Sequence, residues 1–437
     1  MVHDLLRLFL RAADRTPRGI DRIDLAYARY LAAEWPAPYC GVLPTPLGPR
    51  LIARDRVLRG LARLEALWQE DAAASADPML AHVRARLGRR AAEPPPPPAA
   101  PPAATLSRLR SLLAEAGHGA GDPAVARAPR NAVYLNLGQL GWAAPFGTRW
   151  LDRRRDIRPV FMLHDAIPVE RRDLVSALGH WTHRMMLHSV ARRAAGLIVT
   201  TDAAARSVHA ALAARGRTGV PTVGIPLPVA PAFLAPVPRD AALAAHRFFL
   251  VCGAIEPRKN LPMLLDAWAV LRRRLGDAVP MLVVAGAPAR QSAPILARLR
   301  AAGRDVTVVA NLSSPALRLL MAHARALLMP SLAEGFGLPV IEALTLGTPV
   351  LASDLPAHRE AGGDFPAYLD PQDPDAWAAA ITALAEDGPA AAAARARVAA
   401  YRPFTEADYF ARAAAFLRDL AERRPGEQGQ RRERQGI

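Results

Sequence analysis

The stretch Glu334–Glu342, EGFGLPVIE, places two carboxylates around two glycines, an aromatic residue and a proline. It follows the apolar run ALLMPS (326–331) almost directly, and an apolar sequence continues beyond it. A short buried strand that leads into a helix is the repeating unit of a parallel α/β sheet. Pro339 suits the first helical turn, where its missing N–H is no loss. We therefore predict that Glu334 lies in a strand-to-helix loop and that Glu342 lies one turn inside the helix.

The alternation of strand and helix extends over most of the chain. From Phe248 onward the other strand-like runs are FFLVCG, MLVVAG, VTVVA and PVLAS, and before it they are NAVYLNLG, PVFMLH and GLIVTT. Helix-length amphipathic stretches such as LPMLLDAWAVLRRRL (261–275) lie between them. Short buried strands that alternate with amphipathic helices indicate doubly wound parallel sheets. We predict an α/β protein of two Rossmann-like domains that face each other across a cleft.

The domain boundaries follow from changes in composition. The proline-rich stretch IPLPVAPAFLAPVPRD (225–240) is typical of a hinge, so we predict one domain over 1–235 and a second over 236–422. Residues 91–104, AAEPPPPPAAPPAA, have nothing to bury and are predicted to be a disordered spacer. The polar tail 423–437 is predicted to be disordered as well.

Composition excludes several classes of protein. The 437 residues are 51% hydrophobic, and no apolar run is long enough to span a membrane. Two cysteines, Cys40 and Cys252, are too few for a disulfide framework or a cysteine-built zinc site. The N-terminus has no small-residue cleavage site, so we predict a cytoplasmic protein without a signal peptide.

The formal charge of +16 comes almost entirely from arginine, because Lys259 is the only lysine. Such a charge is compatible with nucleic acid, a membrane surface or an anionic substrate. We interpret most of the arginines as solvated helix-surface residues. The chain has no zinc finger, basic zipper or aromatic RNA-binding motif, so we predict no nucleic-acid partner.

The loop around Glu334 has the features of a ligand site. In open parallel sheets, ligands bind beyond the carboxyl ends of the strands, near helix N-termini. Gly335 and Gly337 allow the backbone to approach a ligand closely, and free N–H groups of the helix suit anions. A diphosphate would repel the two acids, so we assign them to sugar hydroxyls. These features together predict a nucleotide sugar, with the lone Lys259 and its neighbour Arg258 neutralising the phosphates.

Several motifs together resemble family 4 of the retaining glycosyltransferases, which have the two-domain GT-B fold. The resemblance is carried by GAIEPRKN (253–260), PSLAEGFGLPVIEAL, GTPVLASD and REAGG, in that order. In the first half, LHDAIPVE (163–170) and TPRGIDRIDLAYARYL (16–31) are similar to the family's His-Asp segment and its N-terminal glycine loop and helix.

The resemblance implies roles for individual residues. Glu334 and the amides around Phe336, Gly337 and Leu338 would contact the donor sugar, and Glu342 would hold the ribose. Arg258 and Lys259, beside Gly253 and Gly335, would neutralise the diphosphate. His164 and Asp165 would lie across the cleft near the sugar, and Gly19 would begin a loop that faces acceptor and phosphates. Ala254 and Thr201 stand where many members have Arg and Ser, and both departures blur the subgroup.

The implied reaction is retaining transfer of a hexose of the mannose or glucose type from a nucleoside-diphosphate sugar. The implied acceptor is a saccharide or a polyprenyl-diphosphate-linked sugar, in the assembly of bacterial surface polysaccharides. We expect no metal and no cofactor, because the cations and the helix N-terminus can stabilise the leaving group. We also expect a salt-sensitive contact with an anionic membrane, at the inner face of the plasma membrane.

Three alternatives stay open. A sugar phosphorylase or nucleotide-sugar epimerase could use the same fold. A glycoside hydrolase also uses two carboxylates, although Glu334 and Glu342 flank a single turn rather than a scissile bond. A non-catalytic basic protein that binds nucleic acid or membrane would keep its binding without the two glutamates.

Overall fold

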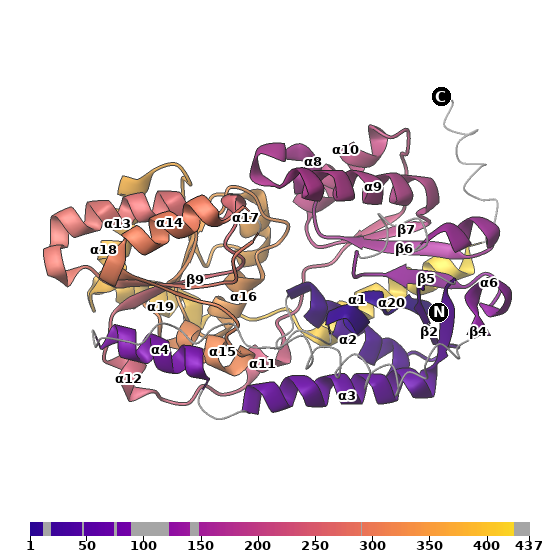
Figure 1. The fold of residues 1–437 in the computed structure, drawn as a ribbon, viewed down its shortest axis with the longest axis horizontal. Helices are drawn as coiled ribbons and strands as arrows, with labels where there is room; N and C mark the ends of the chain where they lie inside the picture. The colour runs from indigo at the N-terminus through magenta and orange to yellow at the C-terminus, as the bar shows by residue number, and fades with distance from the viewer. Residues whose placement is uncertain are drawn as a thin grey trace.

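The computed structural model describes residues 1–11, 19–45, 48–73, 77–88, 122–139, 148–289 and 291–423. The described chain forms two α/β units that lie side by side, each built on its own sheet (Figure 1). The predicted spacer at 91–104 and the tail beyond residue 423 lie outside the described residues. The prediction of an α/β protein with two Rossmann-like sheets is confirmed.

The second sheet contains every strand that the sequence predicted after Phe248. Its strand order is β11-β10-β9-β12-β13-β14, and every pairing in it is parallel. The strands are β9 (Phe248–Cys252), β10 (Met281–Ala285), β11 (Val306–Val309), β12 (Leu327–Met329), β13 (Val350–Ser353) and β14 (Ala367–Leu369). Alternate residues of β9 face two different apolar clusters, so helices cover both faces of the sheet.

The first sheet has the order β4-β3-β2-β1-β5-β6-β7-β8. Its strands are β1 (Val2–Asp4), β2 (Cys40–Leu43), β3 (Arg50–Ala53), β4 (Asp122–Pro123), β5 (Val133–Asn136), β6 (Arg158–Leu163), β7 (Gly196–Val199) and β8 (Thr222–Gly224). Strands β5, β6 and β7 were predicted. The sequence did not predict β1 to β4 or β8, and β3 and β4 pair antiparallel at one edge.

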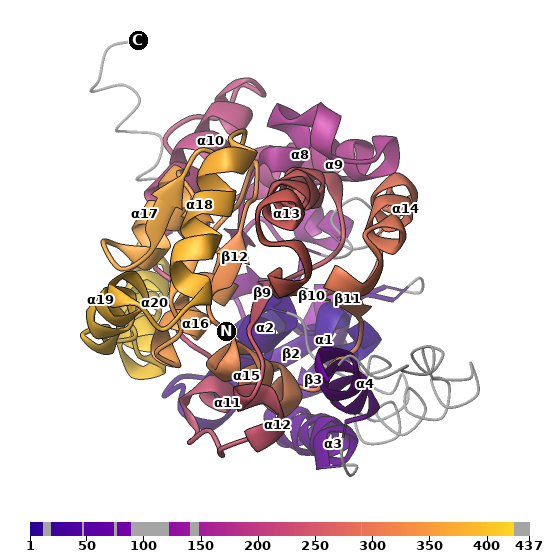
Figure 2. The ribbon, with the colours of Figure 1, turned by 90° about the vertical axis from the view of Figure 1, so that its left-hand side faces the viewer.

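The helices lie on both faces of the two sheets (Figures 1 and 2). Those of the first half are α1 (Leu6–Arg11), α2 (Gly19–Ala33), α3 (Arg54–Ala73), α4 (Pro78–Leu87), α6 (Ala124–Arg127), α8 (Ile167–Glu170), α9 (Ala177–Arg193) and α10 (Asp202–Ala213). The linker carries α11 (Pro231–Leu234) and α12 (Ala241–Ala244). The later helices are α13 (Leu261–Leu275), α14 (Ala293–Ala301), α15 (Ser314–His323), α16 (Leu338–Thr345), α17 (Pro356–Gly362), α18 (Pro374–Ala385), α19 (Pro389–Ala399) and α20 (Glu406–Glu422).

Two helices pack on a different unit from the one to which the predicted boundaries assign them. Helix α4, inside the predicted domain 1–235, packs against β11 and α12 of the second unit. Helix α20, inside the predicted domain 236–422, packs on the first unit, where Tyr409 bonds to Tyr27 through their hydroxyls at 3.1 Å. Both helices therefore pack across the predicted boundaries. Their amphipathic pattern requires burial of one face but does not specify the partner.

The linker between the sheets is packed rather than free. Ile225, Leu227 and Val229 are buried, as is Phe233 of α11. They join an apolar cluster that runs without a break from the first unit to the second. Within the described residues, no helix has the length and apolar character that a membrane span requires.

Candidate active site

The loop after β12 and the start of α16 form the centre of the site. Gly337 has a φ of +101° and precedes α16, where no side chain caps the first turn. A side chain at this position would be strained in the left-handed region and would press on the imidazole of His358. As predicted, Glu334 lies in the loop and Glu342 lies inside α16.

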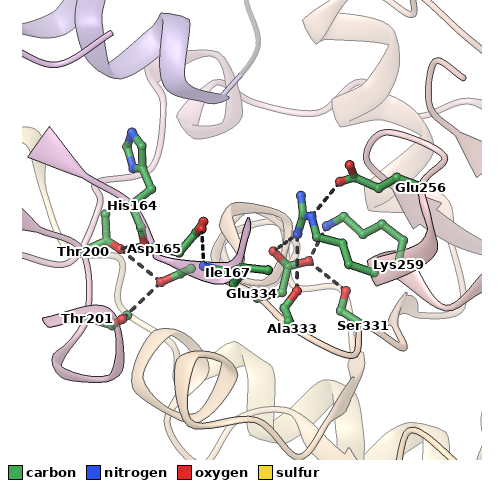
Figure 3. Close-up of polar contacts among 12 residues, drawn as sticks. His164, Asp165, Ile167, Thr200, Thr201, Glu256, Lys259, Ser331, Ala333 and Glu334 are labelled. Atoms are coloured by element: carbon green, nitrogen blue, oxygen red, sulfur yellow. Dashed lines mark hydrogen bonds and ion pairs between the residues drawn. The ribbon is translucent and has the colours of Figure 1, made fainter. Parts of the chain in front are cut away.

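Glu334 is the centre of a buried charge cluster (Figure 3). Its Oε2 accepts from Nη1 of Arg258 at 2.6 Å, and its Oε1 accepts from the ammonium of Lys259 and from the hydroxyl of Ser331. The side chain of Glu334 is only 7% exposed. Burial alone would raise the pKa of Glu334, but Arg258 and then Lys259 outweigh it and hold this pKa well below its ordinary value. Glu334 is therefore an anion across the working pH range.

Two glycines leave the space that the side chain of the lone lysine occupies in this cluster. Lys259 is 6% exposed, and a side-chain carbon on Gly253 would lie 3.0 Å from its Cε. Gly253 also has a φ of +130°. A side chain on Gly286 would collide with the carbonyl group of Gly253. The structure thus brings the predicted residues Gly253, Arg258, Lys259 and Glu334 together, and it adds Gly286 as a packing requirement that the sequence reasoning missed.

Gly335 carries the loop across to the first unit. Its carbonyl oxygen accepts from the hydroxyls of Thr200 and Thr201, each at 3.1 Å. A side chain on Gly335 would collide with the carbonyl oxygen of His164 and approach Asp165 Oδ2 to 3.0 Å. Glycine is therefore needed here for the close approach of the two units. Thr201, noted above as a departure, keeps a hydroxyl at this contact.

Asp165 and His164 face different surroundings on the first unit. Burial raises the pKa of Asp165 to about 6, and nearby Arg258 offsets part of that effect. The His164 imidazole points away from Glu334 (Figure 3), and its Nε2 is buried without a hydrogen-bond partner. Burial, with the charge of Arg7 added, lowers the pKa of His164 to about 4, so the ring is neutral. The structure therefore does not place this nitrogen at the charge cluster around Glu334.

Glu342 contacts a residue that the sequence reasoning did not single out. Arg22 of α2 donates from Nη1 to Oε1 of Glu342 at 2.8 Å and from Nη2 to the hydroxyl of Ser314 at 3.1 Å. Beside this pair is a cavity of about 610 Å³ between the units. Gly19 lines the cavity, and a side chain on it would press on Leu338 at 2.7 Å. Gly19 and Leu338 are thus brought together, but away from the cluster around Glu334.

His358 of α17 is a second residue that was missed. It is fully buried, its Nδ1 lies 2.9 Å from the carbonyl oxygen of Ser353, and its Nε2 has no partner among the residues that the structure describes. Burial lowers the pKa of His358 despite the opposing charge of Glu334. Its position directly before the REAGG motif was the signal that could have drawn attention to it. Phe336, in contrast, is buried with the apolar cluster.

Two Rossmann-like α/β units that face each other are the architecture of the GT-B class of fold. HepE of Anabaena, solved in complex with UDP and glucose, has this arrangement with a TM-score of 0.51. The match covers 66% of this chain and 78% of that one at 18% identity, so it supports the fold alone.

Sequence comparison finds similarity to glycosyltransferases in the second half of the chain. Residues 241–401 match the family model "Glycosyl transferases group 1". O-antigen chain mannosyltransferase B of Escherichia coli is 32% identical over 37% of this chain and 42% of its own length. The D-inositol 3-phosphate glycosyltransferase of Jonesia denitrificans is 30% identical over 57% of this chain and 61% of its own length. The chain thus spans less than two thirds of these relatives, and its similarity to the group 1 glycosyltransferases lies in residues 241–401.

Proposed function

We propose that the protein is a retaining glycosyltransferase that moves a hexose from a nucleoside-diphosphate sugar to a saccharide or lipid-linked acceptor. The observation that carries the proposal is the cluster of Arg258, Lys259 and Glu334 beside the uncapped start of α16. This cluster lies where the two units meet, at the Gly335 contact. Two cations and free helix N–H groups suit a diphosphate, and a fixed carboxylate suits sugar hydroxyls.

In this proposal the two cations, Arg258 and Lys259, stabilise the departing diphosphate. When the bond between the sugar C1 and the diphosphate oxygen breaks, negative charge grows on the diphosphate. Arg258 and Lys259 are already held in place by Glu334, so they stabilise that charge without reorganisation. We propose that this arrangement takes the place of a metal ion. Transfer that is unchanged by EDTA would support this part of the proposal, and transfer that requires an added divalent ion would overturn it.

Retention follows in our proposal from attack on the face that the diphosphate leaves. The acceptor oxygen forms its bond to C1, and its proton passes to an oxygen of the departing diphosphate. Glu334 is an unsuitable nucleophile because both its oxygens are held by cations. Its low pKa also makes it an unsuitable general acid, which argues against the glycoside hydrolase alternative.

We propose a lipid-linked acceptor at an anionic membrane surface, and the outer face of α9 supports this. Leu178, Trp181 and Met185 are 50%, 54% and 36% exposed and recur at helical spacing. The exposed Arg184 lies among them, and neither Arg184 nor its neighbour Arg215 has a carboxylate partner within the described ranges. Tryptophan and arginine on one helix face suit the interface of an anionic bilayer.

The opposite side of the same helix, α9, contacts the site. His183, on the inner side of α9, lies 3.3 Å from the carbonyl oxygen of Asp165 through its Nε2. A bilayer against α9 would therefore hold a lipid-linked saccharide close to His164 and Asp165. The relatives named above include a mannosyltransferase for O-antigen chains, which agrees with a role in surface polysaccharides.

The experiment that tests the function is acceptor-dependent release of nucleoside diphosphate. UDP-glucose, GDP-mannose and related donors would be tested with saccharide and polyprenyl-diphosphate-linked acceptors, and NMR of the product would give the anomeric configuration. Transfer with the donor's configuration supports the proposal. Release without an acceptor would indicate a hydrolase, and an inverted product would overturn the retaining mechanism.

A further inference from the structure

Arg22 extends from the first unit into the second. Helix α2 carries it to the start of α15 and into α16, where it bonds to Ser314 and Glu342. Its guanidinium also lies 5.2 Å from the ring centroid of Phe233, in the linker. The Arg22 side chain is 18% exposed, so the group is held on three sides and mostly out of solvent. Such a guanidinium has little freedom to adopt another position.

The pair differs from an ordinary surface ion pair because its carboxylate is buried. The Glu342 side chain is 5% exposed. Burial raises the pKa of Glu342, and Arg22 is the group that acts against this rise. Without a cation at Oε1, a carboxylate in this position would tend to take up a proton.

One oxygen of Glu342 remains available. Arg22 occupies Oε1, and none of the residues that the structure describes donates a hydrogen bond to Oε2. Glu342 lines the cavity of about 610 Å³, together with Ser314 and the linker residues Pro228 to Ala232. This volume is in the range that holds a nucleoside. A charged acceptor at the wall of such a cavity selects ligands with hydroxyl donors.

We propose that Arg22 is a positioning residue for nucleoside binding: it holds Glu342 through Oε1, with Oε2 turned to the cavity, so that Glu342 can accept hydrogen bonds from ribose hydroxyls. This inference rests on the proposed function, because it requires that the donor carry a ribose. It adds that affinity for the nucleoside depends on a residue of the first unit, although the other donor residues belong to the second.

Isothermal titration of the intact protein with UDP and with GDP, each compared with its 2′,3′-dideoxy form, tests the inference. For the nucleotide that the wild type binds, we expect the ribose form to bind at least about tenfold more tightly than the dideoxy form, since two hydrogen bonds to a charged group are lost. Arg22→Gln should show a smaller preference for ribose at pH 7, because Glu342 loses both the contact at Oε1 and the cation that opposes the effect of burial on its pKa. The preference of this variant should rise with pH, and more steeply than that of the wild type.

Two further variants make the test specific. Arg22→Lys keeps the charge but loses the two-pronged contact, so it should recover part of the ribose preference. Arg84→Gln is the matched control: Arg84 of α4 also forms a pair with a carboxylate, donating from Nε to Oδ2 of Asp240 at 3.0 Å, but it lies outside the cavity wall that the described residues form. We expect this control to match the wild type.

Three outcomes would overturn the inference. A full ribose preference with a level pH profile in Arg22→Gln would refute it while leaving the proposed function intact. An equal loss in Arg84→Gln would show a general effect of removing an arginine–carboxylate pair rather than positioning of Glu342. If the wild type binds no nucleoside diphosphate at all, the proposed function fails and the inference fails with it.

Discussion

Replacing Glu334 with glutamine separates the structural role of the charge cluster from its role toward a ligand. Glutamine keeps the shape of the side chain and removes the charge that Arg258 and Lys259 share. Arg258 retains Glu256 as a partner at 2.7 Å, but Lys259 has no such substitute and is 6% exposed. Leaving one buried charge uncompensated costs roughly 3–5 kcal/mol, and the partner that Arg258 keeps places our expectation near 3 kcal/mol.

The comparison with Lys259→Met makes this expectation testable. That variant removes the buried cation and leaves Glu334 with Arg258 and Ser331, so its stability should stay within about 1 kcal/mol of the wild type. The double variant should recover most of the loss in Glu334→Gln, because no buried lysine then lacks its partner. Ser331→Ala, which removes one neutral hydrogen bond, is the control at about 1 kcal/mol. Denaturant midpoints of the four variants provide the measurement.

Ligand binding provides a second measurement of Glu334→Gln, in which we expect a gain in affinity where stability is lost. In Glu334→Gln the two cations lose their internal anion, so a nucleoside diphosphate should bind about tenfold more tightly, or ~1.4 kcal/mol, while sugar transfer falls. The bound diphosphate should also restore much of the stability that Glu334→Gln loses, since a ligand that binds the folded state stabilises it. Equal stability of Glu334→Gln and Lys259→Met, or unchanged affinity for the diphosphate, would refute this account of the cluster.

Three other expectations follow from single residues. Lys259→Arg keeps the charge but replaces a compact ammonium with a wide fork, so turnover at saturating donor should recover only part of the ~10²–10³-fold loss expected for Lys259→Ala; full recovery would argue against a fitted phosphate contact. Because the pKa of His164 is about 4 in the folded chain and near 6.5 when unfolded, the unfolded state gains protons first as the pH falls. This residue should therefore cost about 2 kcal/mol of stability between pH 7.5 and 5, and His164→Asn should lose correspondingly less in denaturant titrations at the two pH values. Trp181→Gln should weaken flotation with anionic vesicles, whereas neutral vesicles should bind neither protein; flotation equal to wild type would remove α9 from the membrane proposal.

The second sheet could be predicted from the sequence because its strands are buried on both faces. Runs such as FFLVCG are continuously apolar and β-branched, which is the pattern of central parallel strands. Strand β1 carries His3 and Asp4 instead, both buried in a polar network in which Tyr134 bonds to Asp4. A three-residue strand with two polar side chains gives no hydrophobic signal. The strands that could be predicted are therefore those that consist of continuous apolar residues.

The local part of the site could likewise be predicted, whereas its long-range pairs could not. Glu334 and Lys259 follow strand ends of the same sheet, so the topology alone places them at one edge. Arg22 and Glu342 are 320 residues apart, and the chain has many arginines. Nothing in the local sequence of α2 distinguishes Arg22 from Arg29. Only the packing of one unit against the other selects it.

The contacts between the units fall on the same elements that carry the proposed donor ligands. The carbonyl of Gly335 bonds to the hydroxyls at 200–201, and Arg22 holds Glu342. Glu360 of α17 accepts from the backbone N–H groups that begin α10. Each contact of this kind contributes about 1 kcal/mol, so together they amount to a few kcal/mol. A ligand can shift an equilibrium only by its differential affinity for the two states. Under the proposed function, a donor that contacts both Gly335 and Glu342 would therefore favour the state in which these contacts between the units are formed.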